Sequence, residues 1–245
     1  MKKIVVACMF CLMFVSFAYA KSRSDVRLGI GGMQSTHKND SAGRELSATG
    51  GYLTLIGRDF YQDGKFYGEG GGDIGFAKSK EKGSSSGRLY YFGEAHLKYG
   101  VNLTANTTTP LYLNIGYSWD QIATDFHDTP KGQSAMGLRT NLHLVGVDLQ
   151  GFIYRSERLA FEYNVGYWYP FYAAYYGNGV FSRVKDYSQV FKAQVGFTYA
   201  LSENVSYFMN LKAKYYDIAR TSAGYSFTYP KAQNLIAMLE LGLQF

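Results

Sequence analysis

Apolar and polar residues alternate with a period of two along most of the chain. The last such run is the clearest: every odd position from Leu235 to Phe245 is apolar, and the even positions include Asn234, Glu240 and Gln244. The same alternation is present at residues 89–99, 111–120, 159–169 and 205–216. Strict alternation is typical of a β-strand with one apolar and one polar face. The pattern therefore predicts an all-β protein.

The length of these runs and the placement of their side chains favour a membrane barrel over a soluble sandwich. The runs are longer than the strands of about 5–6 residues usual in soluble sheets, and they match the roughly 9–11 residues with which a tilted strand crosses a bilayer. Aromatic residues lie near the ends of the apolar faces, as in lipid-facing girdles, and charges lie mid-strand on the other face. Because only a closed barrel pairs every backbone group in lipid, we expect a closed antiparallel transmembrane β-barrel.

Ten strands can be assigned to the chain. The predicted strands are 26–34, 46–57, 65–77, 88–100, 110–120, 136–150, 158–169, 188–200, 204–216 and 233–245. Connectors after the even-numbered strands are short, and those after the odd-numbered strands, at 35–45, 78–87, 121–135, 170–187 and 217–232, are longer. Short turns on one side and long loops on the other are typical of bacterial barrels, which have even strand numbers. Eight strands is the alternative, if two of the weaker segments are loops.

The N-terminal segment has the pattern of a secretory signal peptide. Lys2 and Lys3 precede an apolar run from Ile4 to Phe17, and Ala18-Tyr19-Ala20 offers a small-x-small cleavage site. We expect residues 1–20 to be removed and residues 21–245 to form the barrel. Both cysteines lie in the removed segment, so the barrel is expected to have no disulfide.

The composition argues against three other classes of protein: disordered, helical membrane and nucleic-acid-binding. The chain has 245 residues, of which 47% are hydrophobic, 17% aromatic and 18% charged, and this content argues against disorder. A mean hydropathy of −0.19 argues against a helical membrane protein. The net charge of +6 is spread along the chain and matches no nucleic-acid-binding module, so no nucleic-acid partner is expected.

The signal peptide, the alternating strands and the terminal Leu239-x-Leu241-x-Leu243-x-Phe245 together resemble a small Gram-negative outer-membrane β-barrel protein. In that class, an aromatic last residue such as Phe245 resembles the signal read by the barrel assembly machinery. The resemblance implies a location in the cell outer membrane. It also implies lipid, lipopolysaccharide and the assembly machinery as partners.

Charged residues of both signs have the parity that faces the barrel lumen. They are Arg27, Glu69, Asp73, Glu94, His96, Lys98, Arg139, His143, Glu162, Lys192, Lys212, Lys214 and Glu240. Buried charges are costly unless they are paired, and barrels of about eight strands have interiors filled by side chains. We therefore expect ion pairs across the lumen, with Arg27 and either Lys212 or Lys214 as partners of Glu240. Such a lumen would pass small ions at most.

The predicted outer rim carries basic and aromatic residues. Lys78, Lys80, Lys82 and Arg88 lie close together in sequence and are expected to contact the phosphates of lipopolysaccharide. The aromatic girdle is predicted to include Trp119, Tyr167, Tyr169 and Tyr172. The dense aromatic segment 168–176 could instead be a platform for surface glycans.

Catalytic and metal-binding signals are weak. Asp125 and His127 lie in the third long connector and resemble the Asp/His pair of the omptin outer-membrane proteases. Those enzymes combine this pair with a second pair of acidic residues, and the chain has no Asp-x-Asp sequence. No metal or cofactor is predicted. The preferred function is a structural, surface-binding or narrow-pore barrel whose lumen is largely filled by side chains and open at most to small ions. Small solutes or surface glycans are the further partners considered. The alternatives are an adhesin-like binder of glycan or matrix and a rim-located hydrolase.

Overall fold

The structure is a computed structural model of the whole chain. It describes residues 23–39, 44–82, 87–104, 106–124, 138–177, 180–221 and 229–245. The predicted signal peptide lies outside these residues. In the described part of the chain, no helix has the length and apolar character needed to cross a membrane.

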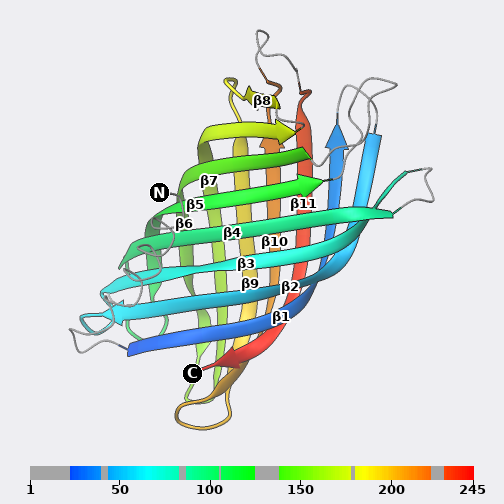
Figure 1. Cartoon of the computed structure of the whole chain (residues 1–245). Coiled ribbons are helices and arrows are strands. Elements are labelled where there is room, and N and C mark those ends of the chain that lie inside the picture. The colour runs from blue at the N-terminus through cyan, green and yellow to red at the C-terminus, as the bar shows by residue number, and fades with distance from the viewer. Residues whose placement is uncertain are drawn as a thin grey trace, which may run out of the picture.

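Within the described residues, ten strands wind into one closed antiparallel barrel (Figure 1). They are β1 Arg23–Asn39, β2 Arg44–Tyr61, β3 Phe66–Glu81, β4 Gly87–Asn102, β5 Leu111–Thr124, β6 Leu138–Arg155, β7 Leu159–Gly177, β9 Gln189–Ala200, β10 Ser206–Ile218 and β11 Ala232–Gln244. Strands that are neighbours in this order pair with each other, and β1 pairs with β11 to close the wall. The prediction of ten strands rather than eight is confirmed.

The two ends of the barrel differ. Short turns, such as Tyr61–Phe66 and 201–205, lie at one end together with the C-terminus, and we call this the short-turn end (Figure 1). Strands β1, β3, β5, β7 and β10 end at the opposite end of the barrel, which we call the long-loop end.

The outer wall is apolar in its middle part and the charged face is turned inward. On β11, Ile236, Met238 and Glu240 are buried, whereas Leu239 and Leu241 are about half exposed. Ile30 is 65% exposed and Ile115 is 68% exposed. A soluble sandwich would bury these apolar side chains between its sheets. The wall is therefore suited to lipid.

Strand β7 is longer than the alternation predicted. The interpretation of residues 170–187 as a loop is wrong, because β7 continues to Gly177 and its last part pairs with the short β8, Val180–Arg183. A β-bulge at Phe171 lets Pro170 lie opposite Leu144 while Tyr172 lies opposite His143. Proline has no backbone N–H to donate, and a bulge is one of the few places in a sheet that accepts it.

Candidate functional site

The lumen is filled by side chains in successive levels, and the level nearest the short-turn end is built on arginine. Arg58 binds Asp25 through Nε at 2.7 Å and Glu162 through Nη1 at 3.0 Å. Arg27 binds the Glu162 carboxylate through both Nη1 and Nη2, and its Nε donates to Gln244 Oε1 at 2.9 Å. One carboxylate thus bridges two arginines across the barrel, in the forked geometry that makes such pairs strong.

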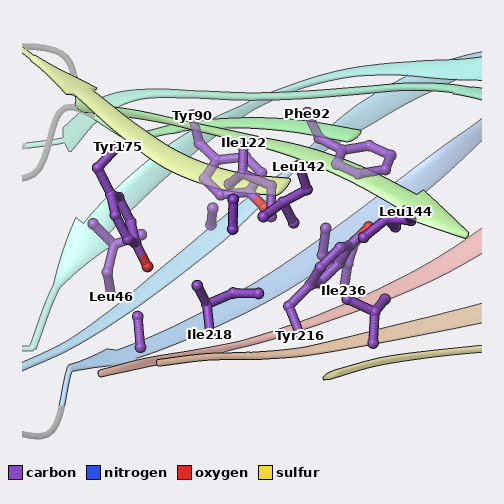
Figure 2. Close-up of a cluster of buried hydrophobic side chains, with 14 of the residues drawn as sticks. Leu46, Tyr90, Phe92, Ile122, Leu142, Leu144, Tyr175, Tyr216, Ile218 and Ile236 are labelled. Carbon is purple, nitrogen blue, oxygen red and sulfur yellow. The ribbon is translucent and has the colours of Figure 1, made fainter. Parts of the chain in front are cut away.

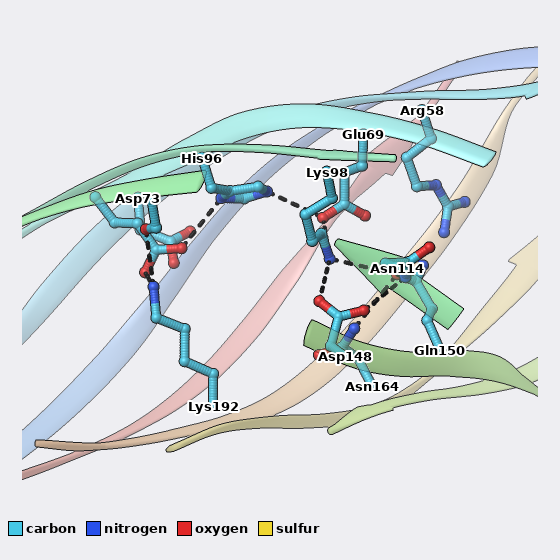
Figure 3. A network of polar contacts seen from close by, with 12 residues as sticks. Arg58, Glu69, Asp73, His96, Lys98, Asn114, Asp148, Gln150, Asn164 and Lys192 are labelled. Atoms are coloured by element: carbon cyan, nitrogen blue, oxygen red, sulfur yellow. Dashed lines mark hydrogen bonds and ion pairs between the residues drawn. The ribbon is translucent and has the colours of Figure 1, made fainter. Parts of the chain in front are cut away.

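The next level centres on His96, which lies between two carboxylates (Figure 3). Its Nε2 is 3.0 Å from Glu69 Oε1, and its Nδ1 is 3.1 Å from Glu94 Oε1. A neutral imidazole has a single N–H, so both contacts are hydrogen bonds only if the ring carries two protons or one carboxylate is protonated. Lys98 completes this level, with Nζ 2.6 Å from Glu69 and 3.5 Å from Asp148.

Lysines from β10 form the following level. Lys214 Nζ is 2.6 Å from Asp73 and 2.5 Å from Glu94. Lys212 Nζ is 3.1 Å from Asp73 and 2.7 Å from Glu240. Each carboxylate and each ammonium here is buried, so the charges are stabilised by one another rather than by water.

Lys192 of β9 extends this level toward β5 and β7. Its Nζ lies 3.0 Å from Asp120, 3.2 Å from Glu94 and 4.9 Å from the centre of the Trp168 ring. Trp168 fits against β6 because residue 146 is glycine: a Cβ there would come within 2.6 Å of Cε3 of the indole. The ring, the ammonium and the carboxylates fill the lumen at this height.

An apolar cluster occupies the lumen at the long-loop end (Figure 2). We call it the apolar plug; its largest fully buried members are Tyr90, Phe92, Leu142, Leu144, Tyr175, Tyr216, Tyr229, Ile236 and Met238. Tyr175 and Tyr229 stack with ring centres 4.1 Å apart. Above the charged levels, the lumen is therefore packed like the core of a soluble protein.

The free space among the charged levels is small. A cavity of about 70 Å³ is lined by Arg27, Glu69, His96, Lys98, Trp168, Lys192 and their neighbours. It can hold a few water molecules, and the 16–18 strands of a porin leave far more room. In the described residues, no group of three or more His, Cys, Asp and Glu is arranged to hold a metal ion.

Most lumen residues singled out in the sequence lie next to a partner of opposite charge. The contacts are Glu69 with Lys98, Glu94 with Lys214, Glu162 with Arg27, and Glu240 with Lys212. Arg27 does not contact Glu240, so that expectation is corrected. The β1–β11 register sets Arg27 opposite Gln244, nearer the short-turn end, and Glu240 opposite Gly31.

Two further expectations for β6 are wrong. Arg139 is exposed, and His143 packs on the outer wall, where Tyr117 Oη lies 2.6 Å from its Nδ1. The inward positions at this height hold Leu142 and Leu144 of the apolar plug. Polar residues of the same strand segment therefore take the outward positions.

Several lumen residues were missed in the sequence. They are Asp25, Arg58, Asp120 and Asp148. Asp25 and Arg58 lie just beyond the predicted ends of their strands. Asp120 and Asp148 do share the parity of buried neighbours, so parity alone would have found them.

The predicted rim residues lie on the outer wall as far as the structure describes them. Lys78, Lys80 and Lys82 are exposed near the long-loop end. The side chain of Arg88, and the whole of Asp125 and His127, lie outside the described residues.

The residues predicted for the aromatic girdle lie on the outer wall. Tyr169 is 44% exposed, and Trp119, Tyr167 and Tyr172 are partly buried on the outer wall. Phe245 is 53% exposed, and its backbone pairs with Val26 of β1.

Comparisons with known proteins show the fold. No protein-family model matches the chain, and no curated protein does. Among solved structures, the chain is similar to the outer-membrane protease OmpT from Escherichia coli, with 14% identity, 91% of this chain and 96% of that chain covered, and a TM-score of 0.59. It is also similar to the translocator domain of autotransporter NalP from Neisseria meningitidis, with 10% identity, coverage of 98% and 95%, and a TM-score of 0.43. The chain thus has the fold of an outer-membrane β-barrel.

Proposed function

We propose that this β-barrel lies in the outer membrane, with its long-loop end outward, and acts through its outer surface rather than through a pore. The observation that carries the proposal is the filled lumen. The levels of paired Arg, Lys, His, Asp and Glu side chains, which we call the charged network, are followed along the barrel axis by the apolar plug. A polar channel needs a continuous column of water, and neither the charged network nor the apolar plug leaves room for one.

The charged network supports a closed lumen because its side chains hold one another in place. Glu94 alone contacts His96, Lys192 and Lys214, which come from three different strands. Passing an ion would require breaking several of these buried contacts at once, and each broken pair leaves a desolvated charge. We infer a structural and surface-binding role, with no steady ion flow.

The proposal includes the partners of such a surface. Lys78, Lys80 and Lys82 are exposed on the outer wall near the long-loop end, where the phosphates of lipopolysaccharide would be within reach. Phe245 directly follows β11 and its backbone pairs with Val26 of β1, and it supports recognition by the barrel assembly machinery. Residues 1–20 would direct export.

Conductance of the refolded barrel in a planar bilayer tests the proposal. We expect no steady current steps in the wild-type chain, because both the charged network and the apolar plug block the axis. A 16- or 18-stranded porin in the same bilayer serves as the positive control. Stable, large conductance steps that scale with the amount of folded barrel would overturn the proposal.

A further inference from the structure

A hollow of about 390 Å³ lies on the outer wall where β5, β6 and β7 run side by side, and we call it the outer-wall pocket. It is lined by Trp119, Gln121, Asn141, His143, Phe171, Tyr172 and Tyr176. None of these is part of the lumen network or of the apolar plug. The closed-lumen function leaves this pocket without a role.

The pocket lies at the height where the outer wall changes from apolar to polar. On the short-turn side of it, the outward residues are Ile115 and Val145, both well exposed. On its long-loop side, Arg139 projects outward from β6. In a membrane, this boundary is the height of the lipid headgroups, so a headgroup is the molecule with direct access to the pocket.

The chemistry of the walls suits a sugar. Trp119, Phe171 and Tyr172 line the pocket, and the negative quadrupole of an aromatic ring attracts the weakly positive C–H groups of a pyranose. Gln121 Nε2 donates to Asn141 Oδ1 at 2.7 Å, which holds the two amides side by side. A few fixed polar groups among aromatic side chains are typical of a small-molecule site.

Two arginines add the charge that an anionic headgroup needs. The Cζ of Arg183 lies 5.2 Å from the centre of the Tyr172 ring, and Arg139 pairs in register with Tyr176. Both arginines are exposed, and no acidic side chain is among the residues that line the pocket. The fork of a guanidinium matches the oxygens of a phosphate group.

We propose that the outer-wall pocket binds the headgroup of a phosphorylated glycolipid of the surrounding leaflet. The sugar ring lies among Trp119, Phe171 and Tyr172, and the phosphate is held by Arg139 and Arg183. The inference rests on the proposed orientation of the long-loop end toward the outer leaflet, and it does not depend on whether the lumen conducts.

Tryptophan fluorescence gives a direct readout of the proposed binding. The chain has two tryptophans, and Trp168 is 3% exposed inside the lumen, so Trp119 is the one that reports on the pocket. Purified short-core lipopolysaccharide is titrated into the refolded barrel in detergent micelles. We expect a saturable change in emission, which the Trp119→Phe variant lacks.

A matched pair of variants separates this pocket from general attraction to positive charge. The double variant Arg139→Gln, Arg183→Gln should weaken binding about tenfold, since it removes two charge-assisted contacts. The control Lys65→Gln, Arg158→Gln removes the same charge from exposed positions in two turns at the short-turn end and should bind as the wild type does. Because all four side chains are exposed, the variants should fold, and thermal unfolding checks this.

Three outcomes would overturn the proposal. One is the absence of a saturable signal, and another is an equal loss of binding in both double variants. The third is binding of the lipid-free, phosphorylated core oligosaccharide as tightly as the intact glycolipid, which would make the pocket a site for soluble glycans. Bilayer conductance of the same preparations reports separately on the closed lumen.

Discussion

At the scale of single residues, the lumen depends on carboxylates that each serve more than one cation. Glu162 contacts two arginines, and Asp73 contacts two lysines. Glu94 is the most connected, because it also meets His96. Removing one member of a buried pair leaves its partner charged and desolvated, which costs far more than losing an exposed pair.

Replacement of Glu94 tests this directly. We expect Glu94→Ala to lower the free energy of unfolding by about 3–5 kcal/mol, since Lys192 and Lys214 lose a buried partner. The control is Glu203→Gln, in an exposed turn, which should change the free energy by less than about 0.5 kcal/mol. Denaturant unfolding from lipid vesicles measures both, and equal effects would contradict a paired network.

At the scale of the strand, the polarity of the two faces reverses along its length. On β3, Glu69 and Asp73 face inward in the lower part and Phe76 faces outward; further along, Ala77 is inward and Lys78 outward. The same reversal occurs on β6. The strands are therefore longer than a membrane requires, and the part beyond the reversal has an apolar interior and a polar exterior like a soluble barrel.

Arginine substitutions on the outer wall locate this reversal. Ile115→Arg, in the middle of the apolar band, should destabilise the barrel by about 2–4 kcal/mol, because the charge enters the bilayer midplane. Gln34→Arg, on the polar part of β1, should cost only about 0–1 kcal/mol. Unfolding free energies in vesicles of one lipid composition compare the two. If Gln34→Arg lowered the unfolding free energy more than Ile115→Arg, the apolar band would not be the part of the wall that lies in the membrane.

At the scale of the whole molecule, the apolar plug and the charged network close the same axis one after the other. The register of β1 with β11 sets Ile236 of the plug (Figure 2) opposite Ser35, nearer the long-loop end than Glu240, a partner of Lys212 at the edge of the charged levels (Figure 3), which lies opposite Gly31. Resistances in series add, so either barrier suffices to stop ion flow. This arrangement makes a specific prediction for barrels in which only one barrier is removed.

Opening the barriers separately and together tests the series arrangement. Tyr90→Ala, Tyr175→Ala, Tyr229→Ala empties part of the plug, and Asp73→Ala, Glu94→Ala, Lys192→Ala, Lys214→Ala removes two charges of each sign from the network. We expect each set alone to leave the planar-bilayer conductance near the wild-type level and the combination to raise it. Steady conductance in the plug variant alone would show that the charged network does not block the axis.

The sequence by itself determined the barrel, because period-two alternation with apolar residues outward is a local property of each strand. It determined the ten strands and the parity of residues such as Glu94, Glu162 and Glu240. Hydrogen-bonded strands fix which face a residue takes, and that can be read without knowing the partners.

Only the tertiary structure decided which charges meet and where polarity reverses. The pairing of Arg27 with Glu162 joins residues 135 positions apart in the chain, and it depends on register and on the curvature that brings β1 opposite β7. The sequence pattern predicts Arg139 and His143 in the lumen because it treats polar residues as facing inward along the whole strand. The interior is apolar at the height of these two residues, so the apolar positions of the alternation face inward there and the polar positions face outward.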